Sequence, residues 1–166
     1  MTDIKQTIPL KPKDGEYYYC FPYTTSTCFT ELMCIVLNAK NIKNFDNYLT
    51  DYLKNNKNEI NKTNSNGHTA LMIACANSNT LSSEECVKIL LKHKAKINLR
   101  DNQGRTALYI TAFHTNNRRI LNTLKLLLKR KNIKIDKYDK KRYTPLMIAS
   151  GHSKTNSTYE TVELLM

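Results

Sequence analysis

The residues of this chain best able to bind a metal or attack a substrate are its 5 cysteines and 4 histidines. Cys20, Cys28 and Cys34 could be imagined as zinc ligands, but their spacing matches no common ligand pattern, and the cysteines form no C-x-x-C pair. Cys34, Cys75 and Cys86 lie in apolar segments. We therefore predict that these three are free thiols buried in a core, in an intracellular protein.

The histidines give no better case for catalysis. His68, His114 and His152 fall near turns or helix ends, and none has a cysteine or carboxylate placed for nucleophilic or acid–base chemistry. With only 4 glycines, a glycine-rich phosphate loop is hard to build. The sequence predicts a protein that is not an enzyme and that takes no cofactor, metal or small-molecule substrate.

These residues are set in a repeating pattern. Three segments align without gaps, and their threonines are 37 and 38 residues apart: Gly67–Ala74, Gly104–Thr111 and Arg142–Ala149. Each is followed by a second apolar block: Cys86–Leu91, Thr123–Leu128 and Thr161–Met166. A fixed period of this length indicates stacked repeats. Each repeat is then two short helices, whose apolar faces are buried only against neighbouring repeats.

The local chemistry agrees with two helices in each repeat. Thr69, Thr106 and Thr144 are predicted to cap the first helix, and Pro145 suits its first position, where no N–H is needed. Capping boxes predict the start of two second helices: Ser82 with Glu85, and Ser157 with Glu160. The polar segment 97–104 ends in glycine and predicts an extended finger with a tight turn.

The pattern resembles the ankyrin repeat, whose signature is T-P-L-H-x-A followed by V-x-x-L-L. That resemblance implies an all-α solenoid of stacked helix pairs, with finger turns or short β-hairpins between repeats. Asparagine- and lysine-rich repeats with long loops between their helices also resemble the ankyrin proteins of large DNA viruses, both giant amoebal viruses and poxviruses.

The resemblance implies the following organisation. Residues 1–29 are a leader or cap, and residues 30–166 are the array, with an atypical capping repeat at 30–66, repeats at about 67–103 and 104–141, and a partial repeat at 142–166. The aromatic leader segment 17–23 either folds over the first repeat or docks a partner. Because the chain ends inside a second helix, we expect a longer array.

Two departures from the signature carry expectations of their own. Met72, Tyr109 and Met147 replace its histidine, so we expect the side-chain hydrogen bonds of that histidine to be missing. Arg142 stands where the other copies have the turn glycine. A side chain there opposes a left-handed backbone, so the left-handed turn is not expected in that copy.

The charge of the chain is concentrated in one stretch. The net charge is +12, yet residues 87–143 hold 17 Lys and Arg against 3 Asp and Glu. Lysines at the repeat spacing are expected to form a ladder along the second helices: Lys88 and Lys125, Lys92 and Lys129, Lys94 and Lys131. Such a ladder is either a solvated outer face or a stripe that binds a polyanion.

In ankyrin proteins, partners lie against the concave surface formed by the finger tips and first helices. That surface would comprise Ser65, Asn66, His68, Asn77, Asn102, Gln103, Arg105, Phe113, His114, Lys140, Lys141, Tyr143 and His152. The resemblance implies a non-catalytic protein–protein interaction scaffold, the recognition part of a viral adaptor for host proteins. The alternative is a nucleic-acid or polyanion binder that uses residues 87–143.

The chain shows no signal for secretion or for the membrane. Its N-terminus lacks the basic and apolar pattern of a signal peptide. No apolar run approaches the roughly 18 to 20 residues that span a bilayer. We therefore expect an intracellular, cytoplasmic protein with a protein partner and no membrane partner.

Overall fold

Four threonines each begin a short helix by accepting a hydrogen bond from the backbone N–H three residues further on, at 3.2 to 3.3 Å. The computed structural model describes residues 29–78, 84–114, 118–152 and 159–166. Its first helices are α1 (Glu31–Leu37), α3 (Ala70–Ala76), α5 (Ala107–Phe113) and α7 (Pro145–His152). The predicted caps at Thr69, Thr106 and Thr144 are confirmed, as is Pro145 at the first position of its helix.

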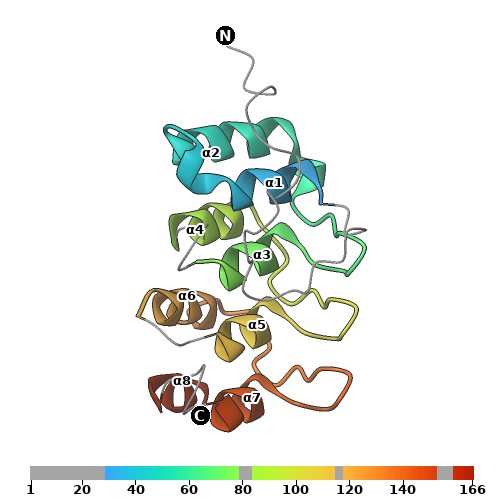
Figure 1. Ribbon diagram of the computed structural model, residues 1–166, viewed down its shortest axis with the longest axis vertical. Coiled ribbons are helices and arrows are strands. Elements are labelled where there is room, and N and C mark those ends of the chain that lie inside the picture. The colour runs from blue at the N-terminus through green and yellow to red at the C-terminus, as the bar shows by residue number, and fades with distance from the viewer. Residues whose placement is uncertain (1–28, 79–83, 115–117, 153–158) are drawn as a thin grey trace.

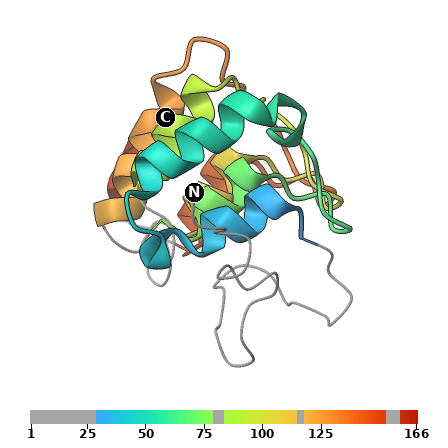
Figure 2. The same ribbon diagram turned by 90° about the horizontal axis from the view of Figure 1, so that it is seen from above.

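A second helix follows each first helix, and it is the longer of the two in the first three pairs. The second helices are α2 (Phe45–Asn55), α4 (Glu84–Lys92), α6 (Arg118–Leu128) and α8 (Tyr159–Leu165), with 3-10 turns η2 (Ala39–Asn41) and η3 (Lys57–Glu59) beside α2. The pairs stack into two parallel rows, first helices in one and second helices in the other (Figure 1). Seen along the stack, the fingers all project to one side (Figure 2). The predicted all-α solenoid is confirmed.

The core lies between the two rows and between neighbouring pairs. Leu71, Leu90, Leu108 and Leu124 are at most 1% exposed, and burying a leucine side chain contributes about 1.5–3 kcal/mol. The cysteines of the described residues, Cys34, Cys75 and Cys86, are buried as free thiols in this core. Their predicted core position is confirmed. Burial is the main reason that the pKa of Cys34 rises to about 11 and that of Cys75 to about 12.

Each finger is a tight turn built on one side chain. Asn64, Asp101 and Asp139 each accept two backbone N–H groups, those two and four residues further on, with one side-chain oxygen at 2.8 to 3.0 Å. The turn also closes through the backbone, because the N–H of Gly67 donates to the carbonyl of Asn64 and that of Gly104 to Asp101. This pairing stays short of a regular hairpin, with one isolated bridge between Thr63 and Thr69.

Arg142 adopts the left-handed conformation that we did not expect of it. Its φ is 70°, against 79° and 83° for Gly67 and Gly104, so the expectation was wrong. The backbone N–H of Arg142 donates to the carbonyl of Asp139 as in the other turns, and its guanidinium lies 4.2 Å from the ring centroid of Tyr138. This cation–π contact, worth about 0.5–1 kcal/mol at an exposed site, offsets part of the backbone strain.

Several sequence-based expectations fall outside the described residues. They are the leader with its aromatic segment 17–23, Cys20 and Cys28, the capping serines Ser82 and Ser157, and most of the loop between the two helices of the second, third and fourth pairs. Within the described residues, no helix is long and apolar enough to cross a membrane. The same residues contain no cluster of three or more metal-ligating side chains.

Candidate functional site

The second and third fingers are held side by side. The backbone N–H of Lys140 donates to the carbonyl of Gln103 at 2.8 Å, repeating the bond from Asn102 to Asn66 between the first two fingers. Arg100 adds a side-chain bond from Nη2 to the carbonyl of Tyr138 at 2.7 Å. These bonds fix the register of one finger against the next, and so they fix the surface between the fingers and the first helices.

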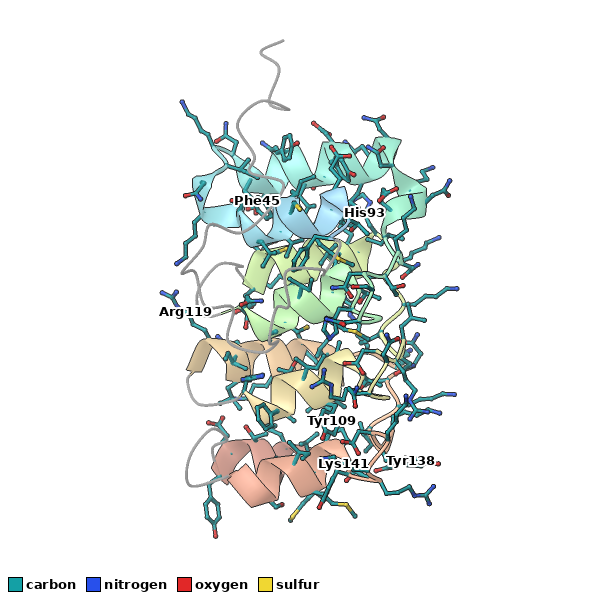
Figure 3. All side chains as sticks on the ribbon, turned by 45° about the vertical axis from the view of Figure 1, so that its right-hand side comes forward. Phe45, His93, Tyr109, Arg119, Tyr138 and Lys141 are labelled. Carbon is teal, nitrogen blue, oxygen red and sulfur yellow. The ribbon has the colours of Figure 1, made fainter. Side chains whose placement is uncertain are left out.

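A depression of about 300 Å³ opens on this surface between α5 and α7. Its walls come from the second finger and α5 on one side and from the third finger and α7 on the other. The lining residues are Gln103, Arg105, Tyr109, Ile110, Phe113, His114, Asp139, Lys140, Lys141, Tyr143 and Ile148. In Figure 3, Tyr109 lies directly above Lys141, whereas Arg119 of α6 projects from the opposite side of the stack.

Tyr109 ties the floor of this depression to the third finger. Its hydroxyl donates a hydrogen bond of 2.9 Å to Oδ2 of Asp139, which is 8% exposed. Burial, followed by this bond to a carboxylate, raises the pKa of the Tyr109 hydroxyl. In this copy the expectation that side-chain hydrogen bonds are missing at the signature histidine position was wrong, because tyrosine provides one to the next repeat.

Arg105 is held at the rim by a buried carboxylate. Its Nε donates to Oδ2 of Asp101 at 2.8 Å, and His68 Nε2 lies 3.4 Å from the same oxygen. Burial alone would raise the pKa of Asp101, but the hydrogen bonds from His68 and Arg105 outweigh it and lower that pKa below its usual value. The guanidinium is therefore positioned before any partner arrives, which reduces the entropy lost on binding.

Seven of the thirteen predicted contact residues meet at this depression: Gln103, Arg105, Phe113, His114, Lys140, Lys141 and Tyr143. The prediction missed four lining residues: Tyr109, Ile110, Asp139 and Ile148. A signal for Tyr109 was present, because Tyr109 and Phe113 are four residues apart and so share one face of α5.

Two predicted contact residues are corrected by the structure. His68 is 2% exposed and lies against Asp101, and Asn77 is 0% exposed. Asn77 ends α3 and its Nδ2 donates back to the carbonyl of Ile73 at 3.0 Å, so its side chain completes the helix end instead of facing a partner. Neither residue offers a contact on the free surface.

The remaining predicted residues lie elsewhere. Ser65, Asn66 and Asn102 form the tips of the first two fingers, where Asn102 Nδ2 donates to the carbonyl of Ser65 at 2.8 Å. They border the same surface but do not line the depression. His152 ends α7, and its side chain falls outside the described residues.

The lysine ladder is partly neutralised. Lys88 pairs with both Glu84 and Glu85 at 3.1 Å, and Lys125 pairs with Glu160 at 2.6 Å. The other four members are exposed and lie at or just beyond the ends of α4 and α6: Lys92, Lys94, Lys129 and Lys131. Lys94 also completes the end of α4, because its φ is 67° and its N–H donates to the carbonyl of Leu91 at 3.2 Å. Of the predicted stripe of six lysines, only the four at the ends of α4 and α6 are without an ion pair to a carboxylate of the described residues.

Stacked helix pairs, threonine caps and hydrogen-bonded fingers agree with the comparison to known families. The profile of the family described as ankyrin repeats (3 copies) matches residues 35–137. The chain belongs to the ankyrin-repeat family. Ankyrin repeats generally mediate protein–protein interactions as non-enzymatic scaffolds, and the depression between α5 and α7 is lined by residues of two fingers and two first helices of these ankyrin repeats.

Similar ankyrin repeats occur in proteins of a giant amoebal virus, as the composition suggested. Ankyrin repeat protein L289 of Acanthamoeba polyphaga mimivirus is 46% identical over 85 residues, which is 47% of this chain and 16% of the relative. Protein L91 of the same virus is 41% identical over 81 residues, 46% of this chain and 13% of the relative. The matched part of the chain therefore spans only a small fraction of these relatives.

Proposed function

We propose that the chain is a protein-binding scaffold whose partner lies against the concave face of its ankyrin repeats, centred on the depression between α5 and α7. The observation that carries this proposal is the convergence there of Arg105, Phe113 and Tyr143. Arginine and aromatic residues are the types enriched at the centres of protein interfaces. Two successive repeats supply them, and the hydrogen bonds between fingers hold these repeats in register.

The relatives suggest the setting in which such a partner would be found. They are ankyrin repeat proteins of a virus that infects amoebae, so we propose that the partner is a host protein. In this proposal the chain is the recognition part of an adaptor, and any recruiting activity belongs to other parts of a longer protein.

Charge reversal at two pairs of exposed lysines, one pair at the depression and one pair away from it, separates this proposal from polyanion binding. Lys140 and Lys141 are exposed at the depression, and Lys92 and Lys129 are exposed at the ends of second helices. The variants Lys140→Glu/Lys141→Glu and Lys92→Glu/Lys129→Glu change the net charge equally. Each is compared with the wild-type chain as bait in a lysate of amoebal cells, after circular dichroism has shown that all three baits are folded.

The proposal predicts a specific partner that is recovered by the wild-type chain and the Lys92→Glu/Lys129→Glu variant, and lost by the Lys140→Glu/Lys141→Glu variant. A partner recovered equally by all three baits would refute the placement of the binding surface. Recovery of nucleic acid that is lost only with Lys92 and Lys129, and that falls steeply with added salt, would support the polyanion alternative instead.

A further inference from the structure

The depression between α5 and α7 carries a positive rim. Lys140 and Lys141 are exposed in its lining, and neither forms an ion pair with a carboxylate of the described residues. Arg105 adds a third cation, although Asp101 pairs with it. An exposed cation without a protein counterion keeps its attraction for a charge that a partner brings.

The one carboxylate among the described residues of the lining is turned into the protein. Asp139 Oδ1 accepts the backbone N–H groups of Lys141 and Tyr143, each at 2.9 Å, and Oδ2 accepts the Tyr109 hydroxyl. Asp139 is 8% exposed, so it presents little negative charge to a ligand. The rim therefore attracts anions, and Asp139 stabilises the turn of the third finger.

Below this rim the lining is apolar. Ile110, Phe113 and Ile148 contribute side chains from α5 and α7, and Tyr143, which is 47% exposed, places its ring at the edge. The volume of about 300 Å³ lies at the lower limit of sites for small ligands. It suits one or two side chains of a bound polypeptide segment. Aromatic rings and branched aliphatic groups favour an apolar or aromatic side chain in such a space.

We infer that this depression recognises an acidic protein segment in which an aspartate or glutamate lies beside a large apolar or aromatic residue. The carboxylate contacts Lys140 and Lys141 on the third finger, and the apolar side chain occupies the space between Phe113 and Ile148. The inference rests on the proposed function, because it names the chemistry of the partner at that surface. A nucleic-acid duplex would satisfy the cations but, with its bases stacked inside, would leave the apolar floor without a matching group.

A phage-displayed library of random peptides tests this chemistry without a known partner. The wild-type chain is used for selection, and the Lys140→Glu/Lys141→Glu variant removes peptides that bind elsewhere. We expect the surviving peptides to be enriched in Asp or Glu next to Phe, Tyr, Leu or Ile. Enrichment of basic or purely apolar peptides, or no enrichment that depends on Lys140 and Lys141, overturns the inference.

One enriched peptide is then synthesised with a fluorophore, and its affinity is measured by fluorescence polarisation. Charge reversal at Lys140 and Lys141 should weaken binding about tenfold or more, which corresponds to about 1.4 kcal/mol. The Lys92→Glu/Lys129→Glu variant should bind as the wild type does. Replacing the acidic residue of the peptide by lysine should restore binding to the Lys140→Glu/Lys141→Glu variant, and failure of this reciprocal change counts against the contact.

Two further outcomes separate this inference from the proposed function. A host protein that requires the depression but binds through a segment without acidic residues leaves the proposed function standing and refutes the inference. A fluorescent single-stranded oligonucleotide that binds the wild-type chain more tightly than the peptide, and that also depends on Lys140 and Lys141, refutes both.

Discussion

Alanine at the turn position of each finger tests how tightly the fingers stack. A Cβ on Gly67 would lie 2.6 Å from Asn102 Oδ1 and 2.7 Å from Asn102 N, which belongs to the backbone of the next finger. A Cβ on Gly104 would lie 2.7 Å from Arg100 Nη2, the end of a flexible side chain, and 3.1 Å from Lys140 N. Position 142 already carries a side chain at φ 70°. The same substitution should therefore cost progressively less along the stack.

The expected losses follow from the contacts. In the Gly67→Ala variant, the left-handed backbone costs about 1–2 kcal/mol. Displacing Asn102 weakens its bonds to Asn66 and Ser65, each worth about 1 kcal/mol, for a total of about 3–4 kcal/mol. Gly104→Ala should cost about 2 kcal/mol, because Arg100 can move aside. Arg142→Ala removes the contact with Tyr138 and should cost only about 0.5–1 kcal/mol.

Urea unfolding followed by far-ultraviolet circular dichroism measures these free energies, since the chain has 10 tyrosines but no tryptophan to report by fluorescence. The account predicts the order Gly67→Ala, Gly104→Ala, Arg142→Ala from most to least destabilised. A loss at Arg142→Ala as large as that at Gly67→Ala would show that contact between neighbouring fingers does not set the cost. So would a Gly67→Ala variant as stable as the wild type, because fingers that separate easily would not hold the binding surface in register.

Three further predictions concern buried polar groups. Tyr109→Phe should lower the free energy of unfolding by about 1–3 kcal/mol, measured by urea unfolding, because Asp139 loses a buried hydrogen bond. The pKa of Asp101 in the folded chain is lowered from its usual value of 3.8. The ionised side chain therefore contributes fully to the free energy of unfolding above pH 3.8, and this contribution is lost as the pH falls through the folded pKa. Unfolding titrations should thus show the stability gap between the wild type and Asp101→Asn narrowing below pH 3.8. Cys34 and Cys75, with pKa values of about 11 and about 12, should resist iodoacetamide at pH 8 in the folded chain, as mapped by mass spectrometry.

Each of these predictions has a control and an opposing result. Tyr52→Phe removes an exposed hydrogen bond of 3.2 Å from the tyrosine hydroxyl to Glu31, and it should lower the free energy of unfolding less than Tyr109→Phe does. Equal losses in the two variants would show that the buried bond of Tyr109 contributes no more than an exposed one. A gap between the wild type and Asp101→Asn that stays constant below pH 3.8 would contradict the lowered pKa. Rapid alkylation of Cys75 before urea is added would show that the core is open.

The repeated framework was predictable from sequence because each of its parts is local. The threonine caps bond only three residues ahead, and the apolar blocks recur at a fixed spacing. The caps and the apolar blocks can therefore be predicted without knowing which residues the neighbouring repeats bring close. Even the missed residue Tyr109 lies four residues before the predicted contact residue Phe113 along α5.

The rest of the site depends on neighbours about one repeat away, which a local pattern does not show. The bond from Tyr109 to Asp139 joins residues 30 apart, and that from Arg100 to Tyr138 joins residues 38 apart. His68 was expected at the surface, but Asp101 and Arg105 of the next finger cover it. The burial of His68 is thus decided by the following repeat.

Site-specific photo-cross-linking can show which face of the ankyrin repeats a partner contacts. A benzophenone amino acid is placed at Tyr143, on the rim of the depression, or at Asn122, an exposed residue of α6. We expect that in an amoebal lysate the chain carrying the probe at position 143 becomes linked to a specific host protein, while the chain carrying it at position 122 does not. Specific linkage at position 122 with none at position 143 would contradict the claim that the partner binds the concave face.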